Sequence, residues 1–335
     1  HRNILANIEQ LGAWFSGTVT EGNEILIAPL PMYHIYCLIS TLMFMKFGGL
    51  TVLITNPRDL PAFVKELGDW KFTRLLGVNT LFNGLLNTAG FDRLDFSGLK
   101  GVVGGGAAIQ KPVAERWQRL TGTFLTEGFG LTEASPIVCC MLPGTAWDGT
   151  VGFPIPSTEV SIRDGEFNEL PLWTGEGDIE KHTGEICVRG PQVMKGYWKN
   201  PAESANVLHD GWLKTGDVGH LDDKGRVTIT DRKKDMILVS GFNVYPSEIE
   251  SVVAAHPGVL ECGVVGVPDE KSGEAVKVVI VRKDPNLTKE SVIEHCRTSL
   301  TSYKVPRHVE FCDALPKTPI GKVLRRELRQ SIQRD

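Results

Sequence analysis

Residues Gly211–Glu250 read GWLKTGDVGHLDDKGRVTITDRKKDMILVSGFNVYPSEIE and contain the most informative pattern of the chain. The β-branched run Arg226–Thr230 predicts a strand, and Met236–Ser240 predicts a second one. Five consecutive charged residues, 231–235, lie between the two strands. The segment Pro246–Glu250 has the proline, hydroxyl and acidic residues of a helix start. A charged link of this kind is most simply a solvated turn.

Two charged side chains in this stretch suggest a second interpretation. The tight turn Thr215-Gly216-Asp217 presents an acid that we expect to be exposed and well placed to bind the diol of a sugar. Arg232 suits either a phosphate or the same ribose, because a guanidinium matches both geometries. The residues alone leave both interpretations open, the solvated turn and the nucleotide site.

The whole stretch resembles the core and hinge motifs of the adenylate-forming superfamily, which contains acyl-CoA synthetases, luciferases and peptide-synthetase adenylation domains. Its run DRKKDMILVSGFNVYP is most similar to bacterial long-chain fatty acid–CoA ligases. The resemblance implies that Asp217, Ile229 and Arg232 bind the nucleotide. It also implies that Asp231 is a hinge and that Ser240 and Gly241 border the pantetheine of coenzyme A.

Composition limits the class of protein. The 335 residues exceed one ordinary domain, and 41% hydrophobic with 23% charged residues is typical of a globular protein. A net charge of -4 argues against nucleic acid as a partner. The seven cysteines, odd in number and without a C-x-x-C pair, favour reduced thiols in the cytoplasm. The run Ile25–Met45 lacks charged residues, but Pro29, Pro31 and His34 argue against a membrane span. Peripheral contact with the inner membrane stays open.

The first 150 residues alternate between predicted strands and helices. Strands are expected at 25–28, 50–55, 74–77 and 99–104, and helices at 3–14, 36–46, 59–68, 79–86 and 111–120. This alternation predicts a doubly wound parallel sheet in an α/β domain. The segment Pro29–His34 then follows the first strand of the sheet, at the end where such sheets bind ligands. A lone histidine is more often a core residue with a satisfied hydrogen bond, whereas the resemblance implies that His34 borders the carboxylate substrate.

A run of glycines, Gly104-Gly105-Gly106-Ala107, lies between a predicted strand and helix. It lacks the G-K-[ST] of a phosphate loop and a complete G-x-G-x-x-G, so by itself it predicts a tight turn. Glycines at a helix start also let the backbone approach a ligand closely. The resemblance implies that Gly105 lines the acyl pocket and that Gly106 and Ala107 line the adenine pocket.

The segment Thr126–Glu133, TEGFGLTE, reads as a glycine-rich loop and resembles the family run EGYGLTE. The resemblance implies that Glu127, Gly128 and Phe129 bind the nucleotide, with the Phe129 ring stacked on adenine. Thr132 and Glu133 are the implied catalytic pair. The hydroxyl of Thr132 would contact phosphate, and the carboxylate of Glu133 would hold Mg²⁺ beside the phosphates.

Two further parts follow. Residues 151–230 have the short strands and turns of a small β-barrel or distorted sheet within the same domain, with a surface loop at Gly165–Thr183. Residues 231–335 predict a compact, mobile α+β domain that ends in the segment LPKTPIGKVLRREL, 315–328. A lysine among arginines near a chain end is ordinarily solvated. The segment resembles the family motif PKTxxGKxxRR, which implies that Lys322 neutralises charge between a carboxylate and the α-phosphate.

The resemblance implies a two-step reaction with fatty acid, ATP, Mg²⁺ and coenzyme A. ATP activates the acid as acyl-AMP with release of pyrophosphate, and coenzyme A then takes the acyl group as a thioester. The domain beginning at Asp231 would rotate between the steps, because a few residues between two strands suit a hinge. Acyl chain length and homodimer formation stay open.

The chain opens on His1, not Met, just before the predicted helix 3–14, and it lacks the family's Ser/Thr/Gly-rich phosphate loop, so we expect a piece of a longer enzyme that is inactive alone. One alternative is a sibling ligase that activates an aryl or amino acid or serves a carrier protein. A second is a module that binds AMP or acyl-adenylate without turnover. A nicotinamide dehydrogenase is disfavoured because the dinucleotide motif is incomplete.

Overall fold

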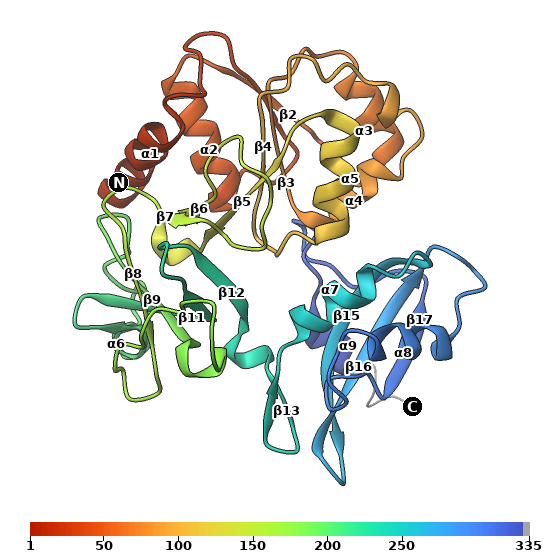
Figure 1. The fold of residues 1–335 in the computed structure, drawn as a ribbon. Coiled ribbons are helices and arrows are strands. Elements are labelled where there is room, and N and C mark those ends of the chain that lie inside the picture. The colour runs from red at the N-terminus through yellow and green to blue at the C-terminus, as the bar shows by residue number, and fades with distance from the viewer. Residues whose placement is uncertain (331–335) are drawn as a thin grey trace. The chain divides into compact units, whose positions relative to one another are not determined.

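The computed structural model describes residues 1–330, and the chain divides into two compact units. Residues 1–109 and 113–229 form the first unit, and residues 110–112 with those from 230 onward form the second. Within the described range the strands form three sheets, two in the first unit and one in the second (Figure 1). No helix in residues 1–330 is long and apolar enough to cross a membrane.

The first sheet of the first unit is mixed. Across it the strands run in the order β2 (Leu50–Leu53), β1 (Ile25–Ala28), β3 (Arg74–Gly77), β4 (Gly101–Gly104), β5 (Leu125–Gly130), β6 (Ile137–Cys140) and β7 (Phe153–Pro154). The first five are parallel; four of them were predicted, and β5 is the addition. β6 and β7 are antiparallel, because only the short 3-10 helix η2 (Thr132–Ala134) joins β5 to β6, and a parallel pair needs a long crossover.

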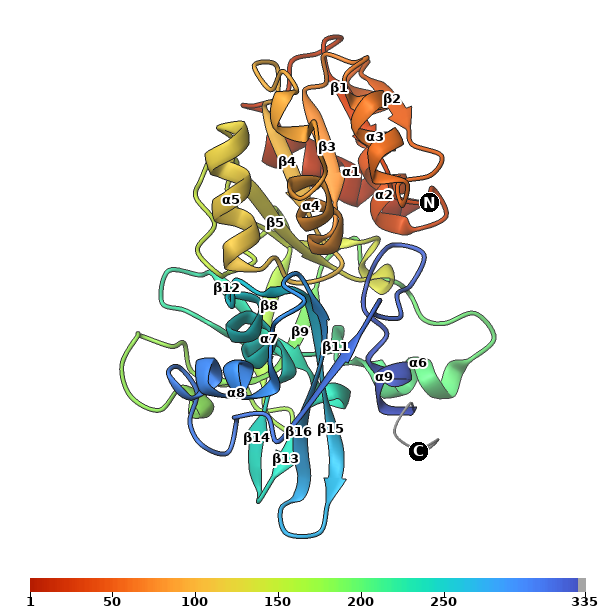
Figure 2. The same ribbon diagram turned by 90° about the vertical axis from the view of Figure 1, so that its right-hand side faces the viewer.

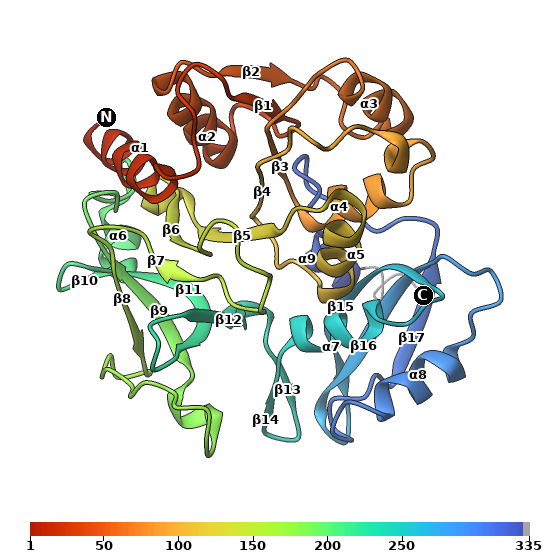
Figure 3. The ribbon, with the colours of Figure 1, turned by 45° about the horizontal axis from the view of Figure 1, so that its top comes forward.

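Helices cover both faces of the parallel strands (Figures 1 and 3). One face packs against α1 (Arg2–Phe15) and α2 (Ile35–Lys46). The other packs against α3 (Leu60–Leu67), α4 (Asn79–Leu86) and α5 (Lys111–Thr121), and the short 3-10 helix η1 (Phe91–Arg93) adds Phe91 to the same core. Trp117 of α5 is fully buried there, edge-on to Phe82 of α4 at 5.1 Å between ring centroids. The doubly wound arrangement predicted from the alternating strands and helices is therefore confirmed.

A buried ion cluster connects the amino ends of β1, β3 and β4. The carboxylate of Glu24, just before β1, accepts hydrogen bonds from Thr73 Oγ1 at 2.6 Å, Arg74 Nε at 3.0 Å and Lys100 Nζ at 2.9 Å. These three donors precede or begin β3 and β4. Burial raises the pKa of Glu24, but the hydrogen bonds outweigh it and lower that pKa from 4.5 to about 2.

The second sheet of the first unit is open and irregular rather than a closed barrel. Its strands are β8 (Glu159–Arg163), β9 (Gly184–Arg189), β10 (Leu208–His209), β11 (Trp212–Leu221) and β12 (Val227–Arg232), in the order β10-β11-β9-β8 with β12 paired to β11. Helix α6 (Pro201–Val207) precedes β10. The segment Gly165–Thr183 is a mostly exposed loop, as expected, with a short 3-10 helix, η3 (Ile179–His182).

The second unit is one five-stranded sheet with helices on both faces. Its strands are β13 (Ile237–Val239), β14 (Phe242–Val244), β15 (Val259–Asp269), β16 (Gly273–Arg282) and β17 (His308–Cys312). Helices α7 (Pro246–Ala254) and α8 (Lys289–Arg297) pack against one face, and α9 (Arg325–Gln330) packs against the other (Figure 2). Helix α9 begins within the segment 315–328, and residues 331–335 lie outside the described part of the chain.

The charged link at 231–235 is only partly the solvated turn that its composition suggested, because Lys233 and Lys234 are exposed whereas Asp231 is buried. Asp231 and Arg232 continue strand β12, and the other three residues form the 3-10 helix η4 (Lys233–Asp235). The carboxylate of Asp231 is buried and accepts hydrogen bonds from the backbone N–H of Arg232 at 2.7 Å and of Ser247 at 2.8 Å. These hydrogen bonds satisfy the buried carboxylate of Asp231 in place of water, so strand β12 continues into the charged segment.

Removing the Glu24 carboxylate will destabilise the first unit. Glu24→Gln leaves Arg74 buried without its carboxylate, which costs about 3 kcal/mol of unfolding free energy. Because the folded-state pKa is depressed, the contribution of Glu24 is present above pH 4.5 and is lost as pH falls towards 2. Urea unfolding followed by tryptophan fluorescence measures this unit, since all seven tryptophans lie before residue 213.

Glu9→Gln is the matched control for that experiment. Glu9 pairs with Lys46 on the surface, with 67% of its side chain exposed, so the loss should stay below about 1 kcal/mol. Equal losses for the two variants would contradict a stabilising role for the buried cluster.

Candidate functional site

Three of the predicted site segments meet at one edge of the first sheet. β1, β4 and β5 are parallel to their neighbours, so their carboxyl ends lie on the same side. The chain leaves β1 towards His34, leaves β4 through Gly105–Ala107, and leaves β5 towards Thr132 and Glu133. Open α/β sheets bind ligands at this edge.

His34 lies at the start of α2 and is half-buried. Its Nδ1 accepts a hydrogen bond from the backbone N–H of Tyr36 at 3.4 Å, which caps the helix. A neutral ring that accepts at Nδ1 carries its proton on Nε2. His34 is therefore a helix cap at the carboxyl edge and not a core histidine.

The glycine segment after β4 lies close to both neighbouring elements. A Cβ at Gly105 would lie 3.4 Å from the carbonyl oxygen of Gly128 in β5 and 3.5 Å from the ring of Tyr36. The Tyr36 hydroxyl donates to the carbonyl oxygen of Val103 at 2.8 Å. Gly106 has φ +76°, a conformation that favours glycine, and Ala107 is half-buried.

The segment Thr126–Gly130 is part of strand β5, not the glycine-rich loop that its composition suggested. Glycines are tolerated there because the backbone approaches its neighbours. A Cβ at Gly130 would lie 2.4 Å from the carbonyl oxygen of Pro136. The irregular pairing with β6 begins between Phe129 and Gly130.

Glu127 is a buried acid with two donors. Its carboxylate accepts hydrogen bonds from the backbone N–H of Ile109 at 3.1 Å and from Trp147 Nε1 at 2.7 Å. Burial raises the pKa of Glu127 to about 7, against the lowering effect of the two hydrogen bonds. The sequence analysis missed Trp147, because no local pattern links it to a residue twenty positions earlier. Glu127 thus fixes the end of the glycine segment, and its contact with a nucleotide stays a prediction.

Phe129 lies in an apolar cluster that joins the two sheets of the first unit. It is 7% exposed and packs in the same cluster as Val138 and Leu213, against which Ile229 also packs. Most of the ring is therefore covered by protein. Stacking of the Phe129 ring on adenine stays a prediction.

Glu133 follows β5 and is held by an aromatic hydroxyl. Tyr197 Oη donates to Glu133 Oε1 at 2.8 Å, and the backbone N–H of Met194 donates to the Glu133 carbonyl oxygen at 2.7 Å. Burial and this hydrogen bond raise the pKa of Tyr197 to about 12. The neighbouring Thr132 is exposed. The sequence analysis assigned no role to Tyr197, which lies 64 residues away along the chain.

Glu133 offers one carboxylate to a metal ion. Residues 1–330 contain no group of three or more His, Cys, Asp or Glu side chains that could hold one. Mg²⁺ commonly binds one or two carboxylates and completes its shell with phosphate oxygens and water. The single carboxylate of Glu133 fits a phosphate-bound Mg²⁺ of that kind and does not fit a metal held by protein alone.

Asp217 differs from the exposed acid that was expected in a turn. It lies in the ten-residue strand β11 and is 8% exposed. The strand passes through an irregularity between Lys214 and Val218, where Gly216 has φ +74° and Thr215 Oγ1 donates to the Ile186 carbonyl oxygen at 2.7 Å. The prediction of a turn was wrong because a bulge lets the strand continue while it redirects a side chain.

The second unit carries the remaining predicted residues. Arg232 ends strand β12. Ser240 and Gly241, with φ +52° and +84°, form the two-residue turn between β13 and β14. Phe242, just after the turn, is 54% exposed, and its ring stacks on Tyr303 with 4.8 Å between centroids.

Lys322 lies in a short turn that is closed by hydrogen bonds. Its backbone N–H donates to Thr318 Oγ1 at 3.1 Å, and its carbonyl oxygen accepts from the Thr318 N–H at 2.8 Å. Lys317 and Val323 pair as an isolated antiparallel bridge. Lys317 Nζ holds both carboxylate oxygens of Glu261 on β15, at 2.7 and 2.6 Å. Lys322 therefore lies in an ordered turn that is fixed to the sheet.

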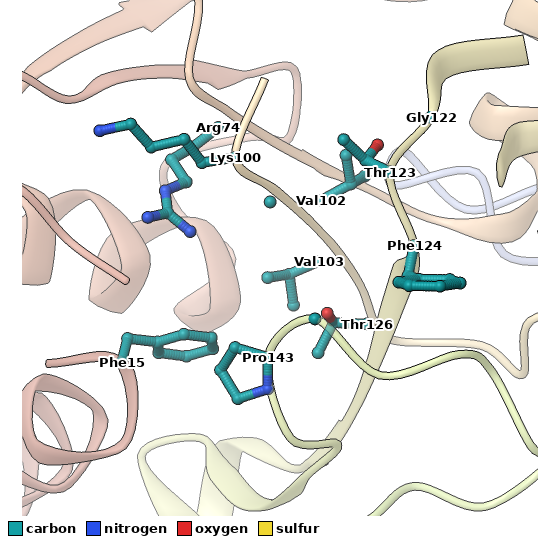
Figure 4. A pocket seen from close by; sticks show the side chains of 12 residues that line it. Phe15, Arg74, Lys100, Val102, Val103, Gly122, Thr123, Phe124, Thr126 and Pro143 are labelled. Atoms are coloured by element: carbon teal, nitrogen blue, oxygen red, sulfur yellow. The ribbon is translucent and has the colours of Figure 1, made fainter. Parts of the chain in front are cut away.

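A cavity of about 200 Å³ lies elsewhere in the first unit. Figure 4 shows Arg74 and Lys100 on one side of it and Thr123 and Phe124 on the other. These residues precede or begin β3, β4 and β5. The cavity is therefore at the amino ends of the strands, opposite the edge where the predicted site residues meet.

Two protein-family models match most of the chain. The model described as AMP-binding enzyme matches residues 1–198, and the model described as AMP-binding enzyme C-terminal domain matches residues 248–322. The chain belongs to the AMP-binding enzyme family. The family resemblance predicted from the sequence motifs is thereby confirmed.

Two relatives of this chain are proteins named long-chain-fatty-acid–CoA ligase. The chain is 52% identical to a long-chain-fatty-acid–CoA ligase of Escherichia coli O6:H1 over 99% of its own length, and 39% identical to one of Bacillus subtilis over 98%. It spans 58% of the length of each of these relatives.

Solved structures of similar fold include complexes with ATP and with an acyl-AMP. ATP-bound MatB from Rhodopseudomonas palustris superposes with a TM-score of 0.88 at 30% identity, over 100% of this chain and 64% of that one. The anthranilate CoA ligase AuaEII, in complex with anthranoyl-AMP, gives 0.86 at 27% identity, over 97% of this chain and 63% of that one. The predicted α/β fold class is therefore confirmed.

We predict that Trp147 reports the ionisation of Glu127. Because the indole N–H donates to the carboxylate, tryptophan emission should titrate with a midpoint near pH 7, where the pKa of Glu127 lies. The raised pKa also means that this group stabilises the fold less as pH rises from 4.5 to 7.

The measurement is a fluorescence titration of the wild type, Trp147→Phe and Glu127→Gln. The transition should disappear in both variants, whereas Trp70→Phe, which leaves the hydrogen bond between Trp147 and Glu127 in place, should keep it. A transition that persists in Glu127→Gln would assign the titration to another group.

Proposed function

We propose that the full-length protein is a long-chain or medium-chain fatty acid–CoA ligase that works through an acyl-adenylate. The observation that carries this proposal is the meeting of His34, the glycine segment and the Glu133–Tyr197 pair at the carboxyl edge of one parallel sheet. High identity to proteins named long-chain-fatty-acid–CoA ligase supports the choice of acid. The seven cysteines are free thiols, six of them buried, which fits a reducing cytoplasm.

The reaction replaces a poor leaving group by a good one in two displacements. A carboxylate oxygen of the fatty acid attacks the α-phosphorus of ATP, and pyrophosphate leaves. The thiol of coenzyme A, as thiolate, then attacks the acyl carbon, and AMP leaves with the electron pair of the C–O bond. Each step joins or separates anions, so catalysis depends on placing positive charge and hydrogen-bond donors.

The first unit supplies the binding surfaces in this scheme. His34 and Gly105 border the carboxylate, while Gly106, Ala107, Gly128 and Phe129 line the adenine pocket and Glu127 holds that pocket's backbone. Asp217 accepts hydrogen bonds from the ribose hydroxyls, with Ile229 beside it. Thr132 donates to a phosphate oxygen. Glu133 would hold Mg²⁺, which supplies positive charge to the phosphates when bound.

The second unit supplies the groups that act in turn. Lys322 places an ammonium between the carboxylate and the α-phosphate, where negative charge accumulates during the first step. Arg232 adds a guanidinium for ribose or phosphate. The turn at Ser240–Gly241 guides pantetheine in the second step. Rotation at Asp231, next to the start of the second unit, would exchange Lys322 for the Ser240–Gly241 turn at one site.

The first test of this function is pyrophosphate release by the full-length protein with a series of fatty acids. Release should require an acid, reach a maximum at one chain length, and fall about 100-fold or more in Lys322→Ala, the size of effect seen when one charge-stabilising donor is removed. Lys289→Ala, an exposed lysine on α8, is the matched control and should match the wild type.

Two results would contradict the proposal. If aryl or amino acids support release and no fatty acid does, the substrate class is that of a sibling ligase. If ATP binds but no acid supports turnover, the protein is a binding module.

The second test concerns Asp217. Asp217→Ala should weaken AMP binding about 10- to 100-fold, because hydrogen bonds to a charged group contribute about 1.5–3 kcal/mol. Isothermal titration calorimetry measures this affinity directly. Asp223→Ala, an exposed acid in the neighbouring turn, should bind AMP as the wild type does. Unchanged affinity in Asp217→Ala would remove Asp217 from the nucleotide site.

A further inference from the structure

Arg325, the first residue of α9, is a mostly buried arginine that the proposed mechanism does not use. Its side chain is 16% exposed. The guanidinium donates from Nε and Nη2 to the two carboxylate oxygens of Glu250, at 3.1 and 2.7 Å, and from Nη1 to Asp231 Oδ1 at 2.8 Å. It also contacts Ser247 Oγ at 3.1 Å and Asp235 Oδ2 at 3.5 Å. One side chain thus joins β12, η4, α7 and α9.

The carboxylates around Arg325 are themselves fixed by other bonds. Asp231 accepts from two backbone N–H groups, those of Arg232 and Ser247. Glu250 Oε1 accepts from the backbone N–H of Val264 in β15 at 2.9 Å. Asp235 also pairs with Arg329, at 3.3 Å. The guanidinium is therefore held in one orientation by elements from across the second unit.

The carboxylates around Arg325 make its guanidinium hard to replace by another side chain. Three carboxylates face Arg325, and Arg329 is the second cation near them. Burial lowers the pKa of Arg325, but Glu250 and Asp231 outweigh it and hold that pKa above its usual range. Loss of the guanidinium would leave buried carboxylates without their counter-charge. A lysine at this position keeps the charge but cannot make the bidentate contact.

Arg325 also follows Lys322 by three residues. The backbone between them is ordered, because the N–H of Leu324 donates to the Pro316 carbonyl oxygen at 2.8 Å and Val323 pairs with Lys317. The turn that carries Lys322 is thus anchored on one side by Lys317 to Glu261 and on the other by Arg325 to Asp231 and Glu250.

We infer that Arg325 is a positioning residue that fixes the Lys322 turn relative to Asp231, where the chain enters the second unit. The inference rests on the proposed role of Lys322 in adenylation. With the guanidinium in place, a dihedral change at Asp231 moves Lys322 as part of a rigid body. Without it, the turn absorbs part of that motion and the ammonium misses the reacting oxygens.

The test measures the two half-reactions of the full-length protein separately. Adenylation is followed as fatty-acid-dependent pyrophosphate exchange into ATP, and thioester formation is followed from supplied acyl-AMP and coenzyme A. The variants are Arg325→Ala, Arg325→Lys, Lys322→Ala and the matched control Arg326→Ala, whose side chain is exposed beside Arg325.

We expect Arg325→Ala to lower the kcat of adenylation at least tenfold with little change in KM for the fatty acid. Thioester formation should stay within about threefold of the wild type, because Lys322 takes no part in that step. Arg325→Lys should recover part of the lost adenylation, and Arg326→Ala should behave as the wild type. If Arg325→Ala fails to fold, the same split between half-reactions is required of Arg325→Lys.

Three other results would each contradict either the positioning role of Arg325 or the catalytic role of Lys322. If both half-reactions fall equally in Arg325→Lys, Arg325 only maintains the fold of the second unit. If adenylation is unchanged in both Arg325 variants while Lys322→Ala loses it, the positioning role is wrong and the proposed function stands. If Lys322→Ala keeps wild-type adenylation, the catalytic assignment itself fails.

Discussion

Parallel pairing of β1, β3, β4 and β5 is the constraint on which the rest of the first unit depends. Parallel strands bring all their carboxyl ends to one edge and all their amino ends to the other. In this protein the two edges have different contents. Thr73, Arg74 and Lys100 bind Glu24 at the amino ends, while His34, the glycine segment and Glu133 follow the carboxyl ends. The buried ion cluster and the residues proposed to bind ligands therefore lie at opposite edges of one sheet.

The second unit uses buried charge in a different way. A single guanidinium, that of Arg325, satisfies carboxylates from β12, η4 and α7, and the same segment of chain carries Lys322. Ion pairs of this kind add little net stability over apolar packing, but they define one geometry because each charge needs its partner. The proposed role of Lys322 requires one defined position of its turn, which such a geometry supplies.

Local sequence patterns predicted much of the fold and part of the site. Alternating apolar runs and helix starts indicated β1, β3, α4 and α7 correctly, since backbone preference and burial act over a few residues. The same reasoning failed where contacts over long sequence separations decide the outcome. Asp217 looked exposed in a Thr-Gly-Asp turn but is buried in a strand, because its neighbours in β9 continue the ladder past the bulge.

The missed site residues share one cause. Tyr197 reaches Glu133 and Trp147 reaches Glu127 across loops, and Arg325 reaches Asp231 over 94 positions. Hydrogen bonds between distant side chains leave no periodic signal in a sequence. The motif resemblance identified the acids at these sites but not the donors that orient them.

Calorimetry on the full-length protein with hydrolysis-resistant acyl-AMP analogues measures whether the protein has a site for a fatty acyl-adenylate. A palmitoyl sulfamoyl adenosine should bind more than about a hundredfold tighter than the acetyl analogue, because each buried CH₂ contributes about 0.8 kcal/mol. Equal affinity for the two analogues would contradict the account, since it would show that the protein binds the adenylate and not the chain.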